Sequence, residues 1–120
     1  MRVLIVESDP NLGHLWKRHI ERSGATVDLV AGQEEAVEQL GFQDFSVLVV
    51  NLILKEGSAL AVADYANYRQ PETKIIFVTS SSFFSDGSIF QHVPNACAFM
   101  PLHTRPEDLA AMVEHYGSRI

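Results

Sequence analysis

Polar residues that could carry chemistry follow the apolar segments of this sequence. Each comes at or just after the end of an apolar run: Glu7, Ser8 and Asp9, then Asn51, then Thr79. Carboxylates gathered in one pocket attract a divalent cation such as Mg²⁺. Met100, which follows a further apolar segment, would bring no charge to such a pocket.

The apolar segments that precede these residues predict strands. Unbroken runs rich in β-branched residues at 3–6, 47–50 and 75–78 are typical of strands covered on both faces, as in a parallel sheet. The run 26–30 alternates between apolar and polar residues, which favours an edge strand with one wetter face. A shorter run at 96–99 predicts a fifth strand.

Helical patterns fill the intervals between these runs. Asp9 is expected to cap a helix that begins at Pro10 and stops near Gly24. The other helices are expected at 33–40 ended by Gly41, at 59–69 closed by Pro71, weakly at 86–92, and from a capping box at Thr104–Glu107 onward.

Five strands alternating with five helices predict a doubly wound parallel α/β sheet, with residues 1–120 forming a single domain. In such a sheet a ligand or active site lies outside the carboxyl ends of the strands. We therefore expect the polar residues described above to meet at that edge.

Four segments together resemble one known family. They read L-I-V-E-S-D-P, V-L-V-V-N-L-I-L-K-E-G-S-A-L, I-I-F-V-T-S and A-F-M-P-L. In order and spacing they resemble the receiver domain of bacterial two-component response regulators. The resemblance implies a three-layer flavodoxin-like (βα)5 fold with strand order 2-1-3-4-5. It also implies transfer of a phosphoryl group to an Asp, with Mg²⁺ held by an acidic pair and with a Lys close by.

The sequence departs from the family pattern at the residues that perform this reaction. Asn51 stands at the phospho-acceptor position, and its amide is a poor nucleophile. Glu7 and Ser8 replace the acidic pair, and Met100 stands in place of the Lys. Only Thr79 matches the pattern. The resemblance therefore implies a degenerate receiver that signals without phosphorylation, with joint loss of Asp and Lys avoiding an unpaired buried charge.

We expect no cofactor beyond weak binding of Mg²⁺ through Glu7, Asp9 and a backbone carbonyl near Ile53. Cys97 falls where receivers place an aromatic switch residue, and a buried, inert thiol is the favoured interpretation there. Structural roles are open for the other site residues: Asn51 and Thr79 would satisfy groups at strand ends, and Met100 would fill a gap.

Two other functions stay open. One is a phospho-accepting regulator with non-standard chemistry, and the other is a small-ligand sensor that uses the vacated pocket. The five histidines lack metal-ligand spacing, and no glycine-rich phosphate loop or nucleophile elbow is present, so we expect no enzyme.

Composition and one loop bear on partners and location. A net charge of −6 argues against nucleic-acid binding, and apolar runs of about half a dozen residues are too short for a membrane span. With one cysteine, the chain fits a reducing compartment, and we expect it in the cytoplasm. The resemblance implies a bacterial protein. Phe83 and Phe84 stand in an otherwise polar loop and predict a surface that binds a protein partner. That partner would be an effector, a kinase or a second copy of the chain. The surface is expected beside the helix at 86–92, the fifth strand and the last helix.

Overall fold

A computed structural model describes residues 1–79 and 94–118 of the chain. Five parallel strands form one sheet in the order β2-β1-β3-β4-β5. The strands are β1 (Arg2–Val6), β2 (Thr26–Val30), β3 (Val47–Asn51), β4 (Lys74–Thr79) and β5 (Ala96–Pro101). The strand order predicted from the resemblance is therefore confirmed, and each predicted strand lies within two residues of its observed bounds.

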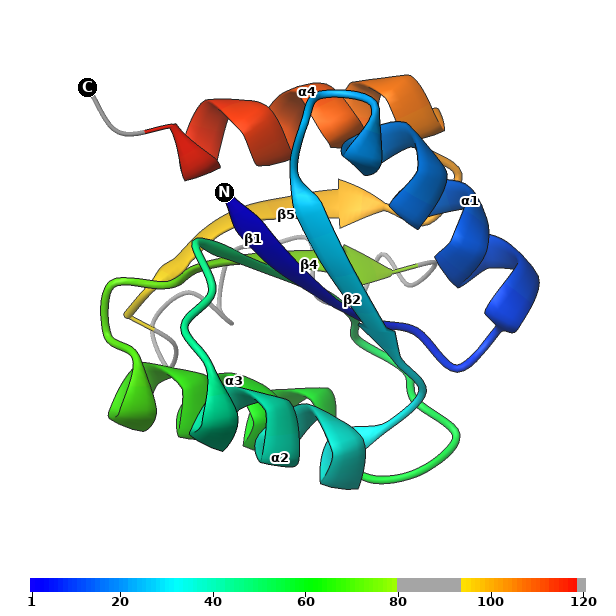
Figure 1. The fold of residues 1–120 in the computed structure, drawn as a ribbon. Helices are drawn as coiled ribbons and strands as arrows, with labels where there is room; N and C mark the ends of the chain where they lie inside the picture. Colours follow the sequence, from blue (N-terminus) through cyan, green and yellow to red (C-terminus); the bar gives the residue numbers. More distant parts are fainter. Residues whose placement is uncertain (80–93, 119–120) are drawn as a thin grey trace.

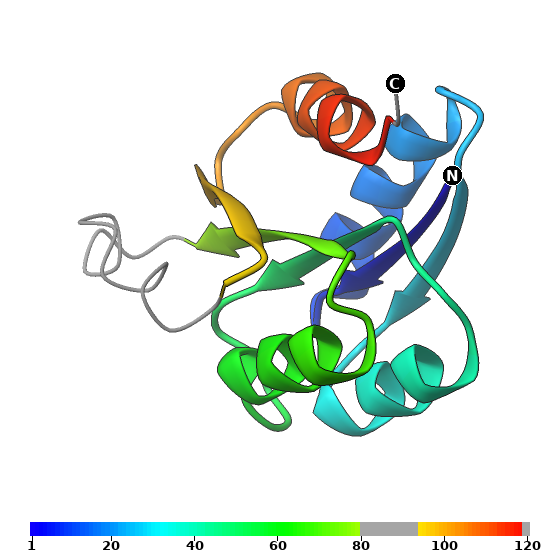
Figure 2. The same cartoon turned by 90° about the vertical axis from the view of Figure 1, so that its left-hand side faces the viewer.

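Helices cover both faces of this sheet and make the predicted three layers. They are α1 (Pro10–Glu21), α2 (Gln33–Phe42), α3 (Ala59–Arg69) and α4 (Pro106–Gly117). Helices α1 and α4 pack together on one face, and α2 and α3 lie side by side on the other (Figures 1 and 2). None of the helices in the two described ranges is long and apolar enough to cross a membrane. The helix expected at 86–92 lies outside the described residues.

The strand sequences explain the layers. Successive side chains of a strand point to opposite faces of the sheet. Val3 and Ile5 pack with α1 and α4, whereas Leu4 and Val6 pack with α2 and α3. All four side chains are fully buried. An unbroken apolar run is therefore what a central parallel strand requires, because both of its faces lie in the core.

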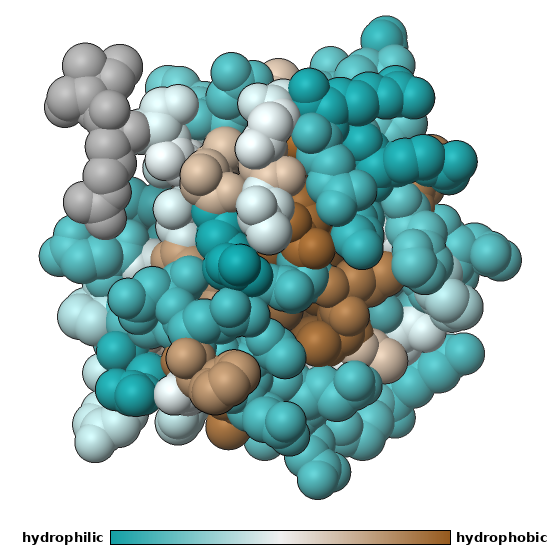
Figure 3. Space-filling model, in the orientation of Figure 1, coloured by the Kyte–Doolittle hydropathy of each residue, from teal (hydrophilic) through white to brown (hydrophobic). Residues whose placement is uncertain are grey.

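Strand β2 is the edge strand that its alternating pattern predicts. It pairs only with β1 among the described strands, and it is less buried than the central strands: Val27 and Val30 are buried, but burial does not alternate strictly along the strand. Figure 3 shows an apolar area over this edge, surrounded by hydrophilic side chains. Leu29 of β2 is half-buried, and a Cβ added at Gly13 would lie 2.8 Å from its Cδ1 atom. Gly13 thus lets α1 approach the edge strand closely.

The ends of α1 follow the sequence signals. The Asp9 side chain accepts hydrogen bonds from the backbone N–H groups of Asn11 and Leu12, and Pro10 takes the first helical turn. Gly24 has a φ of 97°, a left-handed conformation that favours glycine after a helix. Helix α3 has the predicted bounds, with the Ser58 side chain as its N-cap.

Two predicted helix ends are wrong. Gly41 does not end α2: it has no positive φ, and the helix continues until the Gln43 N–H bonds to the Gln39 carbonyl. The capping box at Thr104 does not form either. A residue before proline is driven to extended backbone, so Arg105, with ψ of 137°, becomes the N-cap ahead of Pro106, and it makes no side-chain cap bond.

Candidate functional site

The carboxyl edge of the sheet brings together three of the predicted site residues. Register pairs Val6 with Val50, and Asn51 with Val78, so β1, β3 and β4 end side by side. Glu7, Asn51 and Thr79 are buried there, with exposed fractions of 4%, 8% and 3%. Their convergence at one edge of the sheet follows the prediction made from the strand ends.

Glu7 and Asn51 are bonded directly to each other. The Asn51 Nδ2 group donates to Glu7 Oε1 over 2.7 Å, and Asn51 Oδ1 accepts from the backbone N–H of Ile53 over 3.0 Å. Both bonds fix the amide in one orientation, because a carboxylate only accepts and a backbone N–H only donates. The second oxygen of Glu7 accepts from the backbone N–H of Asp9 over 2.9 Å. Each oxygen of the Glu7 carboxylate therefore accepts one hydrogen bond.

Ser8 and Asp9 serve the surrounding loops. The Ser8 hydroxyl donates to the Ala31 carbonyl over 2.8 Å and accepts from the Lys55 backbone N–H over 3.0 Å. It thereby ties together the loops that follow β1, β2 and β3. Asp9 is exposed, and its carboxylate caps α1 as described. Sequence reasoning missed the bridging role of Ser8, because nothing in a lone serine signals partners in two distant loops.

The donor set does not suit a bound Mg²⁺. An octahedral Mg²⁺ site needs carboxylate or carbonyl oxygens directed at the ion, whereas each Glu7 oxygen is directed at an N–H group and Asp9 Oδ1 caps a helix, so a cation would compete with these bonds. The Asn51 Nδ2 group, which points at Glu7, is a hydrogen-bond donor and cannot ligate a cation. The part of the chain that the structure describes contains no cluster of three or more His, Cys, Asp or Glu residues suited to a metal.

Met100 and Cys97 are half-buried on β5 and pack against the cluster formed by α1, α4 and the sheet. Met100 pairs with Val78 in register and adds only a thioether beside the site. Burial raises the pKa of the Cys97 thiol to about 11, although the nearby Lys74 ammonium acts against this rise. A thiol with this pKa is almost wholly protonated near neutral pH, which agrees with the inert role favoured for Cys97.

Phe83 and Phe84, predicted to form a partner surface, lie outside the described residues.

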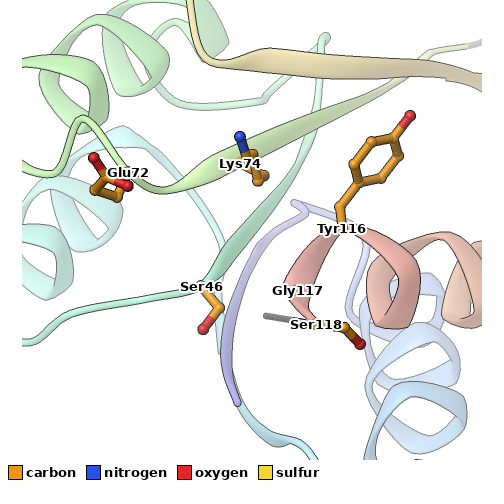
Figure 4. A pocket seen from close by; sticks show the side chains of 6 residues that line it. All are labelled: Ser46, Glu72, Lys74, Tyr116, Gly117 and Ser118. Carbon is orange, nitrogen blue, oxygen red and sulfur yellow. The ribbon is translucent and has the colours of Figure 1, made fainter. Parts of the chain in front are cut away.

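The clefts lined by described residues include one near the site, of about 280 Å³ beside Ile53 and Leu60, and one at the opposite edge of the sheet, of about 200 Å³. In Figure 4, the polar groups of the second cleft diverge: the Lys74 ammonium and Tyr116 hydroxyl point to one side, and the Ser46 hydroxyl to the other. This cleft offers no convergent set of groups for a ligand.

Comparison with known proteins agrees with this geometry. The model for the response regulator receiver domain matches residues 3–92. The response regulator receiver protein CpdR of Brucella abortus is 27% identical over 78 residues, a stretch that spans 65% of this chain and 65% of CpdR.

Solved structures confirm the fold. The non-phosphorylated HemR receiver domain of Leptospira biflexa has a TM-score of 0.87 at 21% identity, over 99% of this chain and 95% of that one. A CheY-like receiver domain protein from Methanospirillum hungatei has a TM-score of 0.86 at 22% identity, over 97% and 92%. The chain therefore belongs to the response regulator receiver domain family of two-component signalling.

Proposed function

We propose that this receiver domain acts without phosphorylation, as a module that binds other proteins in a signalling pathway and catalyses no reaction. Receiver domains typically work through contacts with other proteins. The observation that carries the proposal is the 2.7 Å bond from Asn51 Nδ2 to Glu7 Oε1.

An amide in this position lacks the chemistry of an acceptor. A carboxylate attacks phosphorus with a negatively charged oxygen, whereas the nitrogen lone pair of an amide is delocalised into its carbonyl group. Asn51 also uses its Nδ2 and Oδ1 atoms in hydrogen bonds, to Glu7 and to the Ile53 N–H. Attack by either atom would break a bond inside a buried site.

The charges around the site support the same proposal. Phosphoryl transfer depends on cations that neutralise the developing negative charge. Met100 supplies none, and no Lys or Arg of the described residues forms an ion pair with Glu7. Because both Glu7 oxygens and the Asp9 Oδ1 atom already accept hydrogen bonds, we propose that the domain works without Mg²⁺ and without any other cofactor.

Incubation with acetyl phosphate and Mg²⁺, followed by intact-mass measurement, tests the proposal. The wild-type mass is expected to stay unchanged. A matched positive control restores the missing groups together through Ser8→Asp, Asn51→Asp and Met100→Lys, and it is expected to gain one phosphoryl group. A base-labile adduct on the wild-type chain, mapped to this site, would contradict the proposal and favour a phospho-accepting receiver with non-standard chemistry.

Beryllofluoride provides a second test, because it mimics a phosphoryl group by bonding an acceptor carboxylate. With Mg²⁺ it is expected to leave the amide NMR spectrum of the wild-type chain unchanged, and to shift that of the triple variant. Widespread shifts in β5 of the wild type would mean that switching survives. A ligand sensor would be favoured instead if small anionic metabolites raised the melting temperature of the wild-type chain but not that of the Asn51→Leu variant.

The partner surface of this module was placed from the sequence beside the helix expected at 86–92, β5 and α4. We keep that surface as part of the proposal, and substitutions of Phe83 and Phe84 would test whether it binds a partner. A bacterial, cytoplasmic setting also belongs to the proposal.

A further inference from the structure

A second surface, on the opposite face of the sheet from α1 and α4, exposes aromatic rings. Phe42 at the end of α2 and Tyr68 near the end of α3 have exposed fractions of 84% and 82%. Tyr65 of α3 is half-buried between them. Exposed apolar side chains that gather in one area of a surface mark interaction sites. Phe42, Tyr65 and Tyr68 are called the aromatic surface below.

Two of the rings pack together on α3, and one of them reaches α2 beside Phe42. The ring centroids of Tyr65 and Tyr68 lie 6.5 Å apart. A Cβ added at Gly41 would lie 3.0 Å from the Tyr65 hydroxyl, so this ring reaches the residue next to Phe42. The Arg69 guanidinium donates to the Gly41 carbonyl over 3.2 Å and fixes the ends of the two helices against each other. Figure 2 shows α2 and α3 side by side in this layer.

Carboxylates surround the aromatic surface. Residues four apart on a helix share one face, which places Glu38 beside Phe42 and Asp64 beside Tyr68. Both carboxylates are exposed. Helices α2 and α3 together carry four acidic residues, Glu34, Glu35, Glu38 and Asp64, against the single cation Arg69. Figure 3 shows a largely hydrophilic surface over α2, interrupted by a small apolar area.

The acidic character continues beyond the ends of the helices. A cleft of about 250 Å³ lies beside Arg69, and Asp44 and Glu72 line it with exposed carboxylates. A partner chain that binds the aromatic surface would therefore meet several exposed carboxylates on the same helices and in the neighbouring cleft. Such a surface repels phosphate groups, which excludes nucleic acid and anionic lipid as occupants.

We infer that the aromatic surface binds a basic segment of a partner protein, whose Arg or Lys side chains lie over Phe42 and Tyr68. Cations are attracted to the faces of aromatic rings, and the carboxylates of Glu38 and Asp64 would accept hydrogen bonds from the same side chains. Phe42 and Tyr68 are well suited to anchor an interface, because aromatic residues dominate binding energy there. The inference does not depend on whether Asn51 accepts a phosphoryl group, since the two sites share no residue.

A synthetic peptide tests this inference with the full chain. The probe is an Arg-rich amphipathic peptide of about 15 residues, and its control is the same peptide with Glu in place of each Arg. We expect the basic peptide to shift the amide NMR signals of α2 and α3 at physiological salt. Phe42→Ala with Tyr68→Ala is expected to weaken binding about tenfold, the loss of two cation–ring contacts of about 0.7 kcal/mol each.

Charge variants separate specific binding from general attraction. Glu38→Gln with Asp64→Asn is expected to weaken binding several-fold, whereas the matched pair Glu21→Gln with Glu114→Gln, on α1 and α4, is expected to leave it unchanged. Circular dichroism confirms that the exposed substitutions keep the fold. If Phe42→Ala with Tyr68→Ala bound the basic peptide as tightly as the wild type, charge attraction alone would explain binding and the inference would be overturned. Self-association in sedimentation that requires the same rings would overturn it in favour of a second copy.

Discussion

Two buried polar clusters stand at opposite edges of one sheet and differ in composition. At the amino-terminal edge, the neutral side chain of Gln70 donates to the carbonyls of Leu40 and Gln43, each over 2.7 Å. Its Oε1 atom accepts from the backbone N–H of Phe45 over 2.8 Å. The Thr73 hydroxyl lies 2.8 Å from the Phe45 carbonyl and 2.9 Å from Gln70 Oε1. Both are acceptors, so its one hydrogen serves one of them at a time.

The cluster at the carboxyl edge is built around a carboxylate instead. Glu7 there relies on two N–H donors, from Asn51 and the Asp9 backbone. A neutral amide whose partners are backbone groups and one hydroxyl has a structural role. A buried carboxylate in the same sheet costs solvation free energy, and its position matches the place where this family performs chemistry. The difference indicates a structural role for Gln70, whereas Asn51 pairs with a buried carboxylate at the edge where this family performs chemistry.

The largest effect is expected from Gln70→Ala. The substitution leaves the Phe45 N–H and the Leu40 carbonyl without partners in the core, at about 1–3 kcal/mol for each unsatisfied group. Urea denaturation is expected to show a loss of about 3 kcal/mol, with a melting temperature lower by roughly 10 °C. Gln39→Ala is the matched control on a half-buried helix position, and is expected to cost less than about 1 kcal/mol. Similar losses for the two variants would remove the structural role given to Gln70.

Asn51→Asp is expected to give the next largest effect, and one that depends on pH. The introduced carboxylate would face Glu7 across the 2.7 Å that the amide now spans. Two carboxylates this close keep one shared proton to a higher pH than free acids do. The unfolded chain releases that proton above about pH 4, so the variant loses stability relative to wild type as pH rises from there. We expect a loss of about 1–2 kcal/mol at pH 7 and little at pH 4.

A second substitution sharpens this prediction. Adding Met100→Lys to Asn51→Asp brings a cation to the site, and it is expected to recover much of the loss at pH 7. The comparison is made by urea denaturation across pH 4–8. A single variant as stable as wild type at pH 7 would mean that the carboxyl edge tolerates two carboxylates, and the proposed reason for the joint loss of Asp and Lys would then be wrong.

Thr73→Val tests the neutral cluster with a smaller change. Valine keeps the shape of threonine but removes the hydroxyl that bonds the Phe45 carbonyl. A loss of about 1 kcal/mol is expected in urea denaturation, because the buried carbonyl loses a partner. Thr26→Val, at an exposed position of β2, is the control and is expected to be near neutral. A neutral result for Thr73→Val would show that this hydroxyl does not contribute to the cluster.

Much of the fold could be predicted from the sequence because a strand buried on both faces is an unbroken apolar run. The runs at 3–6, 47–50 and 75–78 became the three central strands, and the alternating run became the edge strand β2. Helix ends were less certain. Pro106 moved the cap of α4 to Arg105, an effect of backbone geometry that outweighs a side-chain pattern.

The site could be predicted in position but not in its bonds. The polar residues at strand ends met where the parallel topology requires, as the burial of Glu7, Asn51 and Thr79 shows. The sequence did not indicate that Asn51 donates to Glu7. The Gln70 cluster was missed altogether, because a glutamine before a proline resembles any surface turn. Its partners are backbone groups of residues 25 or more positions away.

The smallest effect on stability is expected from a substitution of Cys97. Its thiol lies 3.5 Å from the Ile75 carbonyl. Burial raises its pKa to about 11, from 9.0 for an ordinary thiol. At pH 8 the thiolate fraction, and with it the rate of alkylation by iodoacetamide, is expected to be about 100-fold lower in the folded chain than in urea. The unfolded thiol ionises first, so stability is lost as pH rises between about 9 and 11 and is unaffected by this group below that range. Cys97→Ala is expected to flatten that decline slightly and to leave the melting temperature at pH 7 nearly unchanged. Alkylation of the folded chain as fast as in urea would show a reactive thiol, and Cys97 would then need a role beyond packing.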